Sequence, residues 1–167
     1  MFGAAERDRG CGDRGTTMEL KDFFDINAVN LAITADTKDD ILKELIALLG
    51  LDDKSDSILF KMLKRRENLG STGIGRGIAI PHCRSLVVNR LRVAYGRKAE
   101  GIEYNAIDNQ PVYHFFLIVA PPLEVSNQYL PFLGRLAQFA KDPEITDRLS
   151  ALRSPDEFLS LLDEKAL

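Results

Sequence analysis

The 167-residue sequence lacks the features that mark secreted, membrane-spanning or nucleic-acid-binding proteins. Two cysteines, Cys11 and Cys83, are too few for a disulfide framework, which favours a reducing, cytoplasmic setting. No apolar run approaches about 20 residues, so no segment is expected to span a membrane. The start has no apolar signal segment, which argues against secretion. The net charge of −3 argues against nucleic-acid binding, because such proteins are usually basic.

The composition is that of a soluble globular protein, with 45% apolar and 28% charged residues. Residues 1–17 contain four glycines, balanced charges and one aromatic side chain, so they are predicted to form a flexible tail. Met18 is a candidate natural start, and the residues before it are then either an added artefact or an upstream extension. We expect residues 18–167 to form one domain that buries roughly 70% of the surface of its unfolded chain.

The apolar periodicity predicts an α/β domain, with strands in the middle of the chain and helices towards both ends. Thr37 is predicted to cap the first helix and Gly50 to end it. The predicted strands are 28–33, 78–80, 91–95 and 112–120. Further helices are predicted to begin at Ser55, near Ser126 or Asn127, at 142–144 and at 154–157. The strand 112–120 is nearly all apolar, which is typical of a central strand.

Two of these helices have apolar residues at a spacing that predicts the buried face. For the helix after Ser55, the predicted buried residues are Ile58, Leu59, Met62 and Leu63. A further four residues from Met62 give Arg66, so Arg66 is expected on the inner side and Arg65 elsewhere. For the helix after the central strand, the predicted buried residues are Leu130, Leu133, Leu136, Ala137 and Ala140.

One of only two histidines, His82, directly follows a glycine-rich stretch that runs from Gly70 to Gly77. Three alternating glycines in that stretch permit tight turns and exposed N–H groups, which are able to form an anion-binding concavity. An imidazole is nucleophilic at neutral pH, fixed N–H donors stabilise phosphoryl oxygens, and the nearby Arg66 would neutralise phosphate charge. The combination predicts a site that accepts, holds and passes on a phosphoryl group.

Each part of this site has a plainer interpretation when taken alone. A glycine-rich loop is often only a turn, and a lone histidine is more often structural than chemical. The stretch is not a P-loop, because no Gly-Lys-Ser/Thr follows it, and it lacks the glycine spacing of the dinucleotide fingerprint. No adenine-binding or metal signature is found, so a nucleotide-binding enzyme is the least favoured alternative.

The same stretch resembles a known family over a long motif. The residues Arg66-Glu67-x-x-Gly70-Ser71-Thr72-x-Ile74-Gly75-x-Gly77-Ile78-Ala79-Ile80-Pro81-His82 match the enzyme IIA proteins of the bacterial phosphotransferase system (PTS). The resemblance is to the fructose/mannitol group, and especially to its nitrogen-regulatory branch. It continues through Gly101-Ile102, Asp108 and Pro111-Val112 and covers about residues 18–165.

The resemblance implies a fold, a site and a donor. The implied fold is an α/β sandwich with a mixed sheet flanked by helices. His82 is implied as the phosphoryl acceptor, Arg66 as the site arginine, and Ser71, Thr72 and Gly73 as residues that line the phosphoryl site. The implied donor is an HPr-type phosphocarrier protein, and the implied chemistry needs no metal or cofactor.

Three positions depart from the family pattern. The family usually has a second site histidine early in the helix after the central strand, where this chain has Tyr129. A tyrosine hydroxyl still donates a hydrogen bond, but it does not become cationic. Cys83 replaces the usual glycine after His82, and a small residue that fits there is favoured over an oxidisable thiol. His114 stands in the apolar strand and is interpreted as structural.

We therefore predict a cytoplasmic phosphohistidine phosphotransfer protein that accepts a phosphoryl group on His82, with a regulatory output. Two alternatives stay open. One is a sugar-transport IIA subunit that passes phosphate to an enzyme IIB. The other is a regulatory binding module without phosphotransfer, which Tyr129 favours and which Arg66, Ser71, Thr72 and His82 argue against. The expected partners are the HPr-type carrier and a regulated protein or enzyme IIB, with no nucleic acid.

Overall fold

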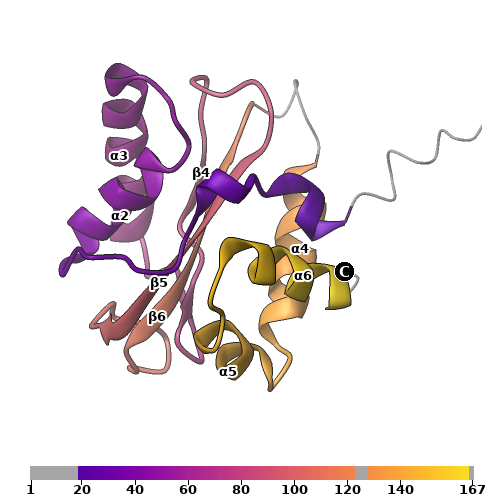
Figure 1. Cartoon of the computed structure of the whole chain (residues 1–167). Helices are drawn as coiled ribbons and strands as arrows, with labels where there is room; N and C mark the ends of the chain where they lie inside the picture. The colour runs from indigo at the N-terminus through magenta and orange to yellow at the C-terminus, as the bar shows by residue number, and fades with distance from the viewer. Residues whose placement is uncertain (1–18, 123–127, 166–167) are drawn as a thin grey trace, which may run out of the picture.

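A computed structural model describes residues 19–122 and 128–165. It shows a six-stranded mixed sheet between two layers of helices (Figure 1), which confirms the predicted α/β sandwich. The predicted tail 1–17 and the predicted helix start near Ser126 or Asn127 lie outside the described residues. Within the described ranges, the helices are too short or too polar to cross a bilayer.

The sheet has the strand order β1-β5-β6-β3-β2, and β4 also pairs with β6. The strands are β1 (Val29–Asn30), β2 (Gly73–Gly75), β3 (Ile78–Ala79), β4 (His82–Arg84), β5 (Arg92–Ile102) and β6 (Val112–Ala120). β6 is antiparallel to β5 and parallel to both β3 and β4. β6 is therefore central, as its apolar composition predicts, and it has the predicted bounds.

The helices divide between the two faces of the sheet (Figure 1). One layer contains α2 (Lys38–Ala47) and α3 (Asp53–Asn68). The other contains α4 (Tyr129–Ala140), α5 (Ile145–Ser150) and α6 (Pro155–Lys165). The short 3₁₀ helices η2 (Leu20–Phe23) and η3 (Ile26–Ala28) precede β1, and η2 lies against α4 and α6. β1 is shorter than the predicted strand 28–33, because η3 includes Ala28 and the pairing with β5 ends at Asn30.

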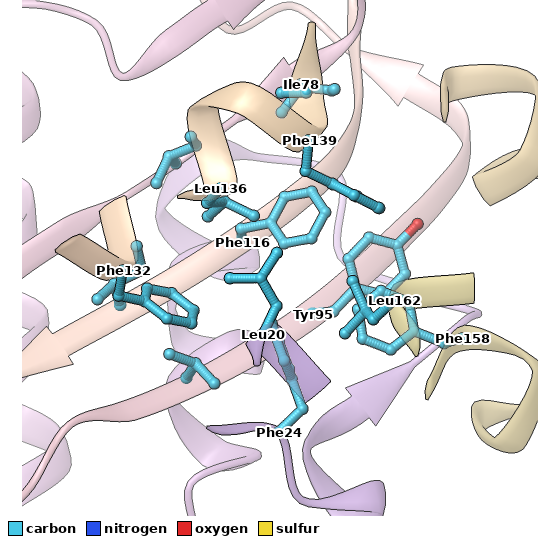
Figure 2. Packing of buried hydrophobic residues seen from close by; sticks show 14 of the residues in the cluster. Leu20, Phe24, Ile78, Tyr95, Phe116, Phe132, Leu136, Phe139, Phe158 and Leu162 are labelled. Atoms are coloured by element: carbon cyan, nitrogen blue, oxygen red, sulfur yellow. The ribbon is translucent and has the colours of Figure 1, made fainter. Parts of the chain in front are cut away.

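Each face of the sheet has its own hydrophobic core. Figure 2 shows the core on the α4–α6 side, where side chains of η2, β5, β6, α4 and α6 interlock. In that core Tyr95 stacks on Phe158 with ring centroids 4.5 Å apart. The second core lies under α2 and α3. β6 contributes to both by alternation, with Phe116 and Ile118 on the α4 side and Phe115 and Leu117 on the α2–α3 side.

Local capping fixes most helix starts, with one correction. Thr37 caps α2 as predicted, and its hydroxyl accepts a hydrogen bond from the Asp40 N–H at 3.1 Å. The predicted opening of the next helix at Ser55 is wrong by two residues. α3 begins at Asp53, because the Asp52 carboxylate accepts the Ser55 N–H at 2.7 Å and is the cap. Ser154 caps α6 through the Glu157 N–H, as predicted.

Two predicted buried residues are exposed. In α3, Leu59 and Leu63 are buried, whereas Ile58 is 38% exposed. In α4, Leu130 is 66% exposed. The face of α4 that packs on the sheet is instead centred on three aromatic residues, Tyr129, Phe132 and Phe139, together with Leu136 and Ala140. The helix is thus rotated from the predicted phase, since the large rings fill the space above the sheet.

Candidate functional site

His82 lies at a break in the strand that runs beside β6. β3 and β4 pair with successive parts of β6, and Ile80-Pro81 separates them. The His82 ring then turns back so that Nδ1 lies 2.7 Å from the Ile80 carbonyl oxygen. A carbonyl oxygen only accepts hydrogen bonds, so Nδ1 carries the proton. The neutral ring therefore has its lone pair on Nε2, the nitrogen available to act as a nucleophile.

The surroundings of His82 favour the neutral ring. Burial lowers the pKa of His82 below its usual 6.5, and the nearby charge of Arg66 lowers it further. The hydrogen bond to Ile80 and the charge of Glu67 oppose this shift without reversing it. The imidazole is thus half-buried and uncharged near neutral pH, which is the form that a nucleophile needs.

Arg66 comes from the last turn of α3, in the opposite helical layer from Tyr129. Its Nη1 donates a hydrogen bond to the Gly70 carbonyl oxygen at 2.8 Å. Arg66 is half-buried and Arg65 is exposed, as the helical spacing predicts. The structure brings His82 and Tyr129 together, with ring centroids 6.1 Å apart, and the charge of Arg66 acts to lower the pKa of both residues.

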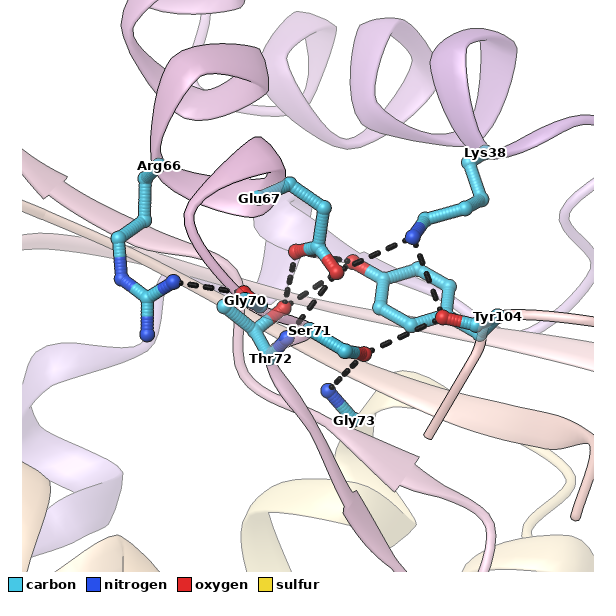
Figure 3. A network of polar contacts seen from close by, with 8 residues as sticks. All are labelled: Lys38, Arg66, Glu67, Gly70, Ser71, Thr72, Gly73 and Tyr104. Carbon is cyan, nitrogen blue, oxygen red and sulfur yellow. Dashed lines mark hydrogen bonds and ion pairs between the residues drawn. The ribbon is translucent and has the colours of Figure 1, made fainter. Parts of the chain in front are cut away.

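Behind Arg66, the Glu67 carboxylate organises the turn that precedes β2 (Figure 3). It accepts hydrogen bonds from the Thr72 N–H at 3.0 Å and the Thr72 hydroxyl at 2.6 Å. Lys38 Nζ lies 3.1 Å from the same carboxylate, and the Tyr104 hydroxyl donates to it at 3.3 Å. Burial opposes ionisation, yet the bonds from Thr72 and Lys38 hold the pKa of Glu67 below its usual value. Glu67 is therefore a buried anion with four donors.

The predicted phosphoryl-binding residues Ser71 and Gly73 belong to the same turn. The Ser71 hydroxyl donates to the Tyr104 carbonyl oxygen at 3.2 Å and accepts the Gly73 N–H at 3.0 Å. A Cβ on Gly73 would lie 2.7 Å from the Ala106 side chain, so this position needs glycine for close packing. The Ser71 and Thr72 hydroxyls and the Gly73 N–H are thus bonded inside the protein (Figure 3).

The rest of the glycine-rich stretch forms a β-hairpin rather than an open loop. β2 and β3 pair in antiparallel fashion around Arg76 and Gly77, which have φ values of 58° and 78°. The Arg76 N–H donates to Asp108 at 3.0 Å, and the Arg76 side chain donates to the Lys141 carbonyl oxygen. The alternating glycines therefore serve the turn and its packing.

Tyr129 is the first residue of α4 and lies next to His82. Tyr129 is 8% exposed, and its ring centroid lies 6.1 Å from that of the His82 ring. Burial raises the pKa of Tyr129 to about 12, so the hydroxyl remains a hydrogen-bond donor at neutral pH. The guanidinium of Arg84 lies 4.6 Å from the centroid of the same ring.

Glu67, Lys38, Tyr104 and Arg84 were not predicted as site residues. Glu67 is part of the motif, but its position in the sequence does not indicate that its carboxylate accepts hydrogen bonds from Thr72. Lys38 and Tyr104 lie far from it in the sequence, so only the folded chain reveals their contacts. The position of Arg84 was predictable, because it lies two residues after His82 and residues two apart on a strand share a face.

The two other notable residues have structural surroundings. Burial raises the pKa of the Cys83 thiol to about 12, so it is not a reactive thiolate. His114 is 2% exposed, and its Nδ1 lies 2.8 Å from the Tyr95 hydroxyl. This agrees with the structural interpretation of both residues. Over 19–122 and 128–165, no group of three or more His, Cys, Asp or Glu is arranged to hold a metal.

The fold and the sheet-edge histidine define a class of protein, the enzyme IIA components of the bacterial PTS. The solved structure of nitrogen regulatory protein IIA-Ntr from Neisseria meningitidis is similar, with a TM-score of 0.77 and 28% identity. The match covers 86% of this chain and 98% of that one. Residues 22–165 match the family described as "Phosphoenolpyruvate-dependent sugar phosphotransferase system, EIIA 2", and the chain belongs to this family.

Curated relatives agree with this assignment. A nitrogen regulatory protein of Klebsiella oxytoca is 38% identical over 128 residues, which are 75% of this chain and 76% of that protein. The fructose-specific EIIABC component of Bacillus subtilis is 30% identical over 149 residues, which are 88% of this chain. The chain spans only 23% of the length of that B. subtilis relative. The predicted family is confirmed, and its members are phosphotransfer components.

Proposed function

We propose that this chain accepts a phosphoryl group on Nε2 of His82 from the phosphohistidine of an HPr-type carrier protein. The observation that carries the proposal is the 2.7 Å contact between His82 Nδ1 and the Ile80 carbonyl oxygen, which leaves Nε2 with its lone pair. The lone pair forms the new N–P bond while the N–P bond of the donor breaks and its electron pair returns to the donor imidazole. Positive charge that develops on the His82 ring is shared through Nδ1–H with the Ile80 carbonyl.

Arg66 is the proposed charge-stabilising residue, since phosphoryl transfer depends mostly on positioning and electrostatic stabilisation. A guanidinium is always cationic and binds phosphoryl oxygens through two parallel N–H groups. The proposed role of Ser71, Thr72 and Gly73 is to shape the turn that contains Gly70. The Gly70 carbonyl oxygen accepts a hydrogen bond from Arg66. The Tyr129 hydroxyl is proposed to donate to a phosphoryl oxygen.

The surface near the site supports a protein as the donor. Leu69, Leu86 and Leu130 are 82%, 87% and 66% exposed, and they are close in the sequence to Arg66, Arg84 and Tyr129. A groove of about 540 Å³ adjoins Arg84 and is lined mainly by Ile58, Met62, Leu86 and Pro122. An apolar groove such as the one beside Arg84 is typical of protein–protein contact sites.

A regulatory output in the cytoplasm is the favoured role of the domain 18–167. The supporting observations are the 38% identity with a nitrogen regulatory protein and the similarity to the IIA-Ntr structure. Transfer of the label from this chain to an enzyme IIB would instead assign it to sugar transport.

The proposal is tested with a phosphorylated HPr-type donor that carries radioactive phosphate. We expect acid-labile label on the wild-type protein and none on His82→Ala. The chain has only one other histidine, so His114→Gln is the matched control and should be labelled. Label that persists in a folded His82→Ala variant, or no label from any donor, would overturn the proposal. The second result would favour the binding module.

A further inference from the structure

β4 presents two side chains to the α4 side of the sheet. Its residues His82, Cys83 and Arg84 pair with Ile118, Val119 and Ala120 of β6. Ile118 and Ala120 belong to the core on the α4 side, whereas Val119 and Cys83 belong to the core under α2 and α3. Because successive side chains of a strand alternate between faces, His82 and Arg84 share the face that α4 covers.

Tyr129 links these two side chains. Its ring centroid lies 6.1 Å from that of His82, at a tilt of 47°, and 4.6 Å from the Arg84 guanidinium. A guanidinium within about 6 Å of a tyrosine ring is attracted by the negative face of the ring. Since Tyr129 is 8% exposed, water weakens this attraction little.

The Arg84 guanidinium is itself fixed by the backbone. Its Nη1 donates to the Pro121 carbonyl oxygen at 3.0 Å, directly after the end of β6. Arg84 therefore bonds the carbonyl that follows the central strand through Nη1, while its guanidinium lies over the ring of Tyr129, the first residue of α4. This arrangement ties the tyrosine ring to the same strand that carries His82.

We propose that Arg84 is a positioning residue of the phosphoryl site, which holds the Tyr129 ring so that its hydroxyl donates to the group transferred to His82. The inference rests on the proposed phosphoryl transfer. In the family pattern a second imidazole occupies the position of Tyr129, and an imidazole has two ring nitrogens that form hydrogen bonds. A tyrosine has one hydroxyl at the end of a long ring, so its use requires that the ring be fixed.

The test measures single-turnover labelling by the phosphorylated HPr-type donor at several donor concentrations. In Arg84→Met, we expect the maximal rate to fall about tenfold or more, as for loss of one charge-assisted bond in a transition state. The half-saturating donor concentration should stay within about threefold of wild type, because the positioning acts on the chemical step. Arg84→Lys keeps a cation over the ring and should fall between wild type and Arg84→Met.

A second pair of variants separates positioning from a general loss of structure. Tyr129→Phe keeps the ring and removes the hydroxyl. If Arg84 acts through that hydroxyl, Arg84→Met should slow the Tyr129→Phe variant by less than about twofold. Arg90→Met removes another arginine, which is exposed, and should leave the rate unchanged.

Each outcome decides the inference. A maximal rate of Arg84→Met within twofold of wild type would overturn it. Equal losses from Arg84→Met in the wild-type protein and in the Tyr129→Phe variant would also overturn it, because Arg84 would then act independently of the hydroxyl. The proposed function fails by a different result, namely a wild-type protein that takes up no label or a His82→Ala variant that does.

Discussion

In the proposed transfer, the hydrogen bond from His82 Nδ1 to Ile80 leaves Nε2 as the nitrogen that would react. Pro81 follows Ile80 directly, and its fixed φ helps to separate β4 from β3 and to bring the ring back over the Ile80 carbonyl. The tautomer of the acceptor is therefore set by two neighbours in the chain. No second side chain is needed to orient the ring, in contrast to sites where a carboxylate does so.

A direct measurement concerns the titration of His82. Burial and Arg66 lower its pKa, against the Ile80 bond and Glu67, and the other groups near the ring are Tyr129, Arg84 and Cys83. We expect the imidazole signal in an NMR titration to have its midpoint below the usual value of about 6.5. The labelling rate should then be constant from pH 8 to neutrality and fall only at lower pH. A His114→Gln sample assigns the signal, and a midpoint above 6.5 would contradict the prediction.

The Thr72 hydroxyl gives a second prediction at this scale. Thr72→Val removes the 2.6 Å bond to Glu67 and leaves a buried carboxylate with one donor fewer. We expect a loss of about 2 kcal/mol in the free energy of unfolding, as is usual for a bond to a charged group. Labelling by the donor should also slow, since the turn that holds Arg66 loosens. The measurements are urea unfolding and single-turnover labelling.

The matched control is Thr34→Val. The Thr34 hydroxyl is exposed and lies 3.4 Å from Glu44, so its loss should change stability by less than about 0.5 kcal/mol. Equal effects of the two substitutions would show that the Glu67 network does not stabilise the turn.

At the scale of secondary structure, local signals predicted much of the fold. A nearly all-apolar run gives β6 its bounds, and Thr37 marks the start of α2 because a side chain close in sequence provides the cap. The phase of α4 was not predictable in this way. Leu130 and Phe132 fit a helical face equally well by hydropathy, and only the space above the sheet selects the aromatic residues.

At the site, too, local patterns were predictable from the sequence and long-range contacts were not. The helical spacing from Met62 placed Arg66 inward, and the structure agrees. The partners of Ser71 and Thr72 were not predictable, because Tyr104 reaches them from a segment some 30 residues away. The glycine-rich stretch gave an ambiguous signal, since alternating glycines suit an anion-binding loop and a tight hairpin alike.

Alanine substitutions at two glycines, one in a strand and one in a helix, are predicted to have opposite effects on stability. Gly101 is the next-to-last residue of β5 and has a φ of 72°. A Cβ at this position would lie 2.6 Å from the Tyr113 ring. Gly101→Ala should therefore cost about 1–3 kcal/mol of stability. Gly134 lies inside α4, where a Cβ would meet nothing within 4 Å. Gly134→Ala should stabilise the protein by about 0.5–1 kcal/mol, because alanine favours the helix.

Thermal or urea unfolding of the two variants provides the measurement, and each variant is the control for the other. A stabilised Gly101→Ala variant, or a destabilised Gly134→Ala variant, would show that the packing around these residues differs from that described.

At the scale of the whole molecule, β5 and β6 tie the α5 region to the sheet through polar groups. Arg97 donates to the carbonyl oxygens of Leu149, Ser150 and Leu152. Beside it, His114 Nδ1 contacts the Tyr95 hydroxyl at 2.8 Å, and its Nε2 lies 3.4 Å from the Ser150 hydroxyl. The buried histidine thus joins the central strand to the helical layer.

This arrangement makes the stability of the fold depend on pH. Burial, together with the charge of Arg97, lowers the pKa of His114 to about 4. The unfolded chain, with a histidine pKa near 6.5, therefore binds more protons than the folded one between these values. Stability contributed by the neutral ring is present above about pH 6.5 and is lost as the pH falls to about 4, by about 3 kcal/mol. The groups around the ring include Tyr95, Arg97, Tyr113 and Ser150.

Urea unfolding at several pH values tests this prediction. His114→Gln should show a smaller loss of stability between pH 6.5 and 4, because the remaining change comes from other groups such as His82. An unchanged slope in a folded His114→Gln variant would contradict the assignment of the pH dependence to this ring.

The attachment of His82 to the sheet has a consequence for how a phosphorylated form would be recognised. Its strand is in register with the last three residues of β6, and Arg66 and Arg84 are each bonded to a backbone carbonyl. A phosphoryl group would bring about two negative charges to a rigid surface. A binding protein would then distinguish the two forms by electrostatic potential and not by shape. That distinction should fade as ionic strength rises, since salt screens charges beyond roughly 8 Å under physiological conditions.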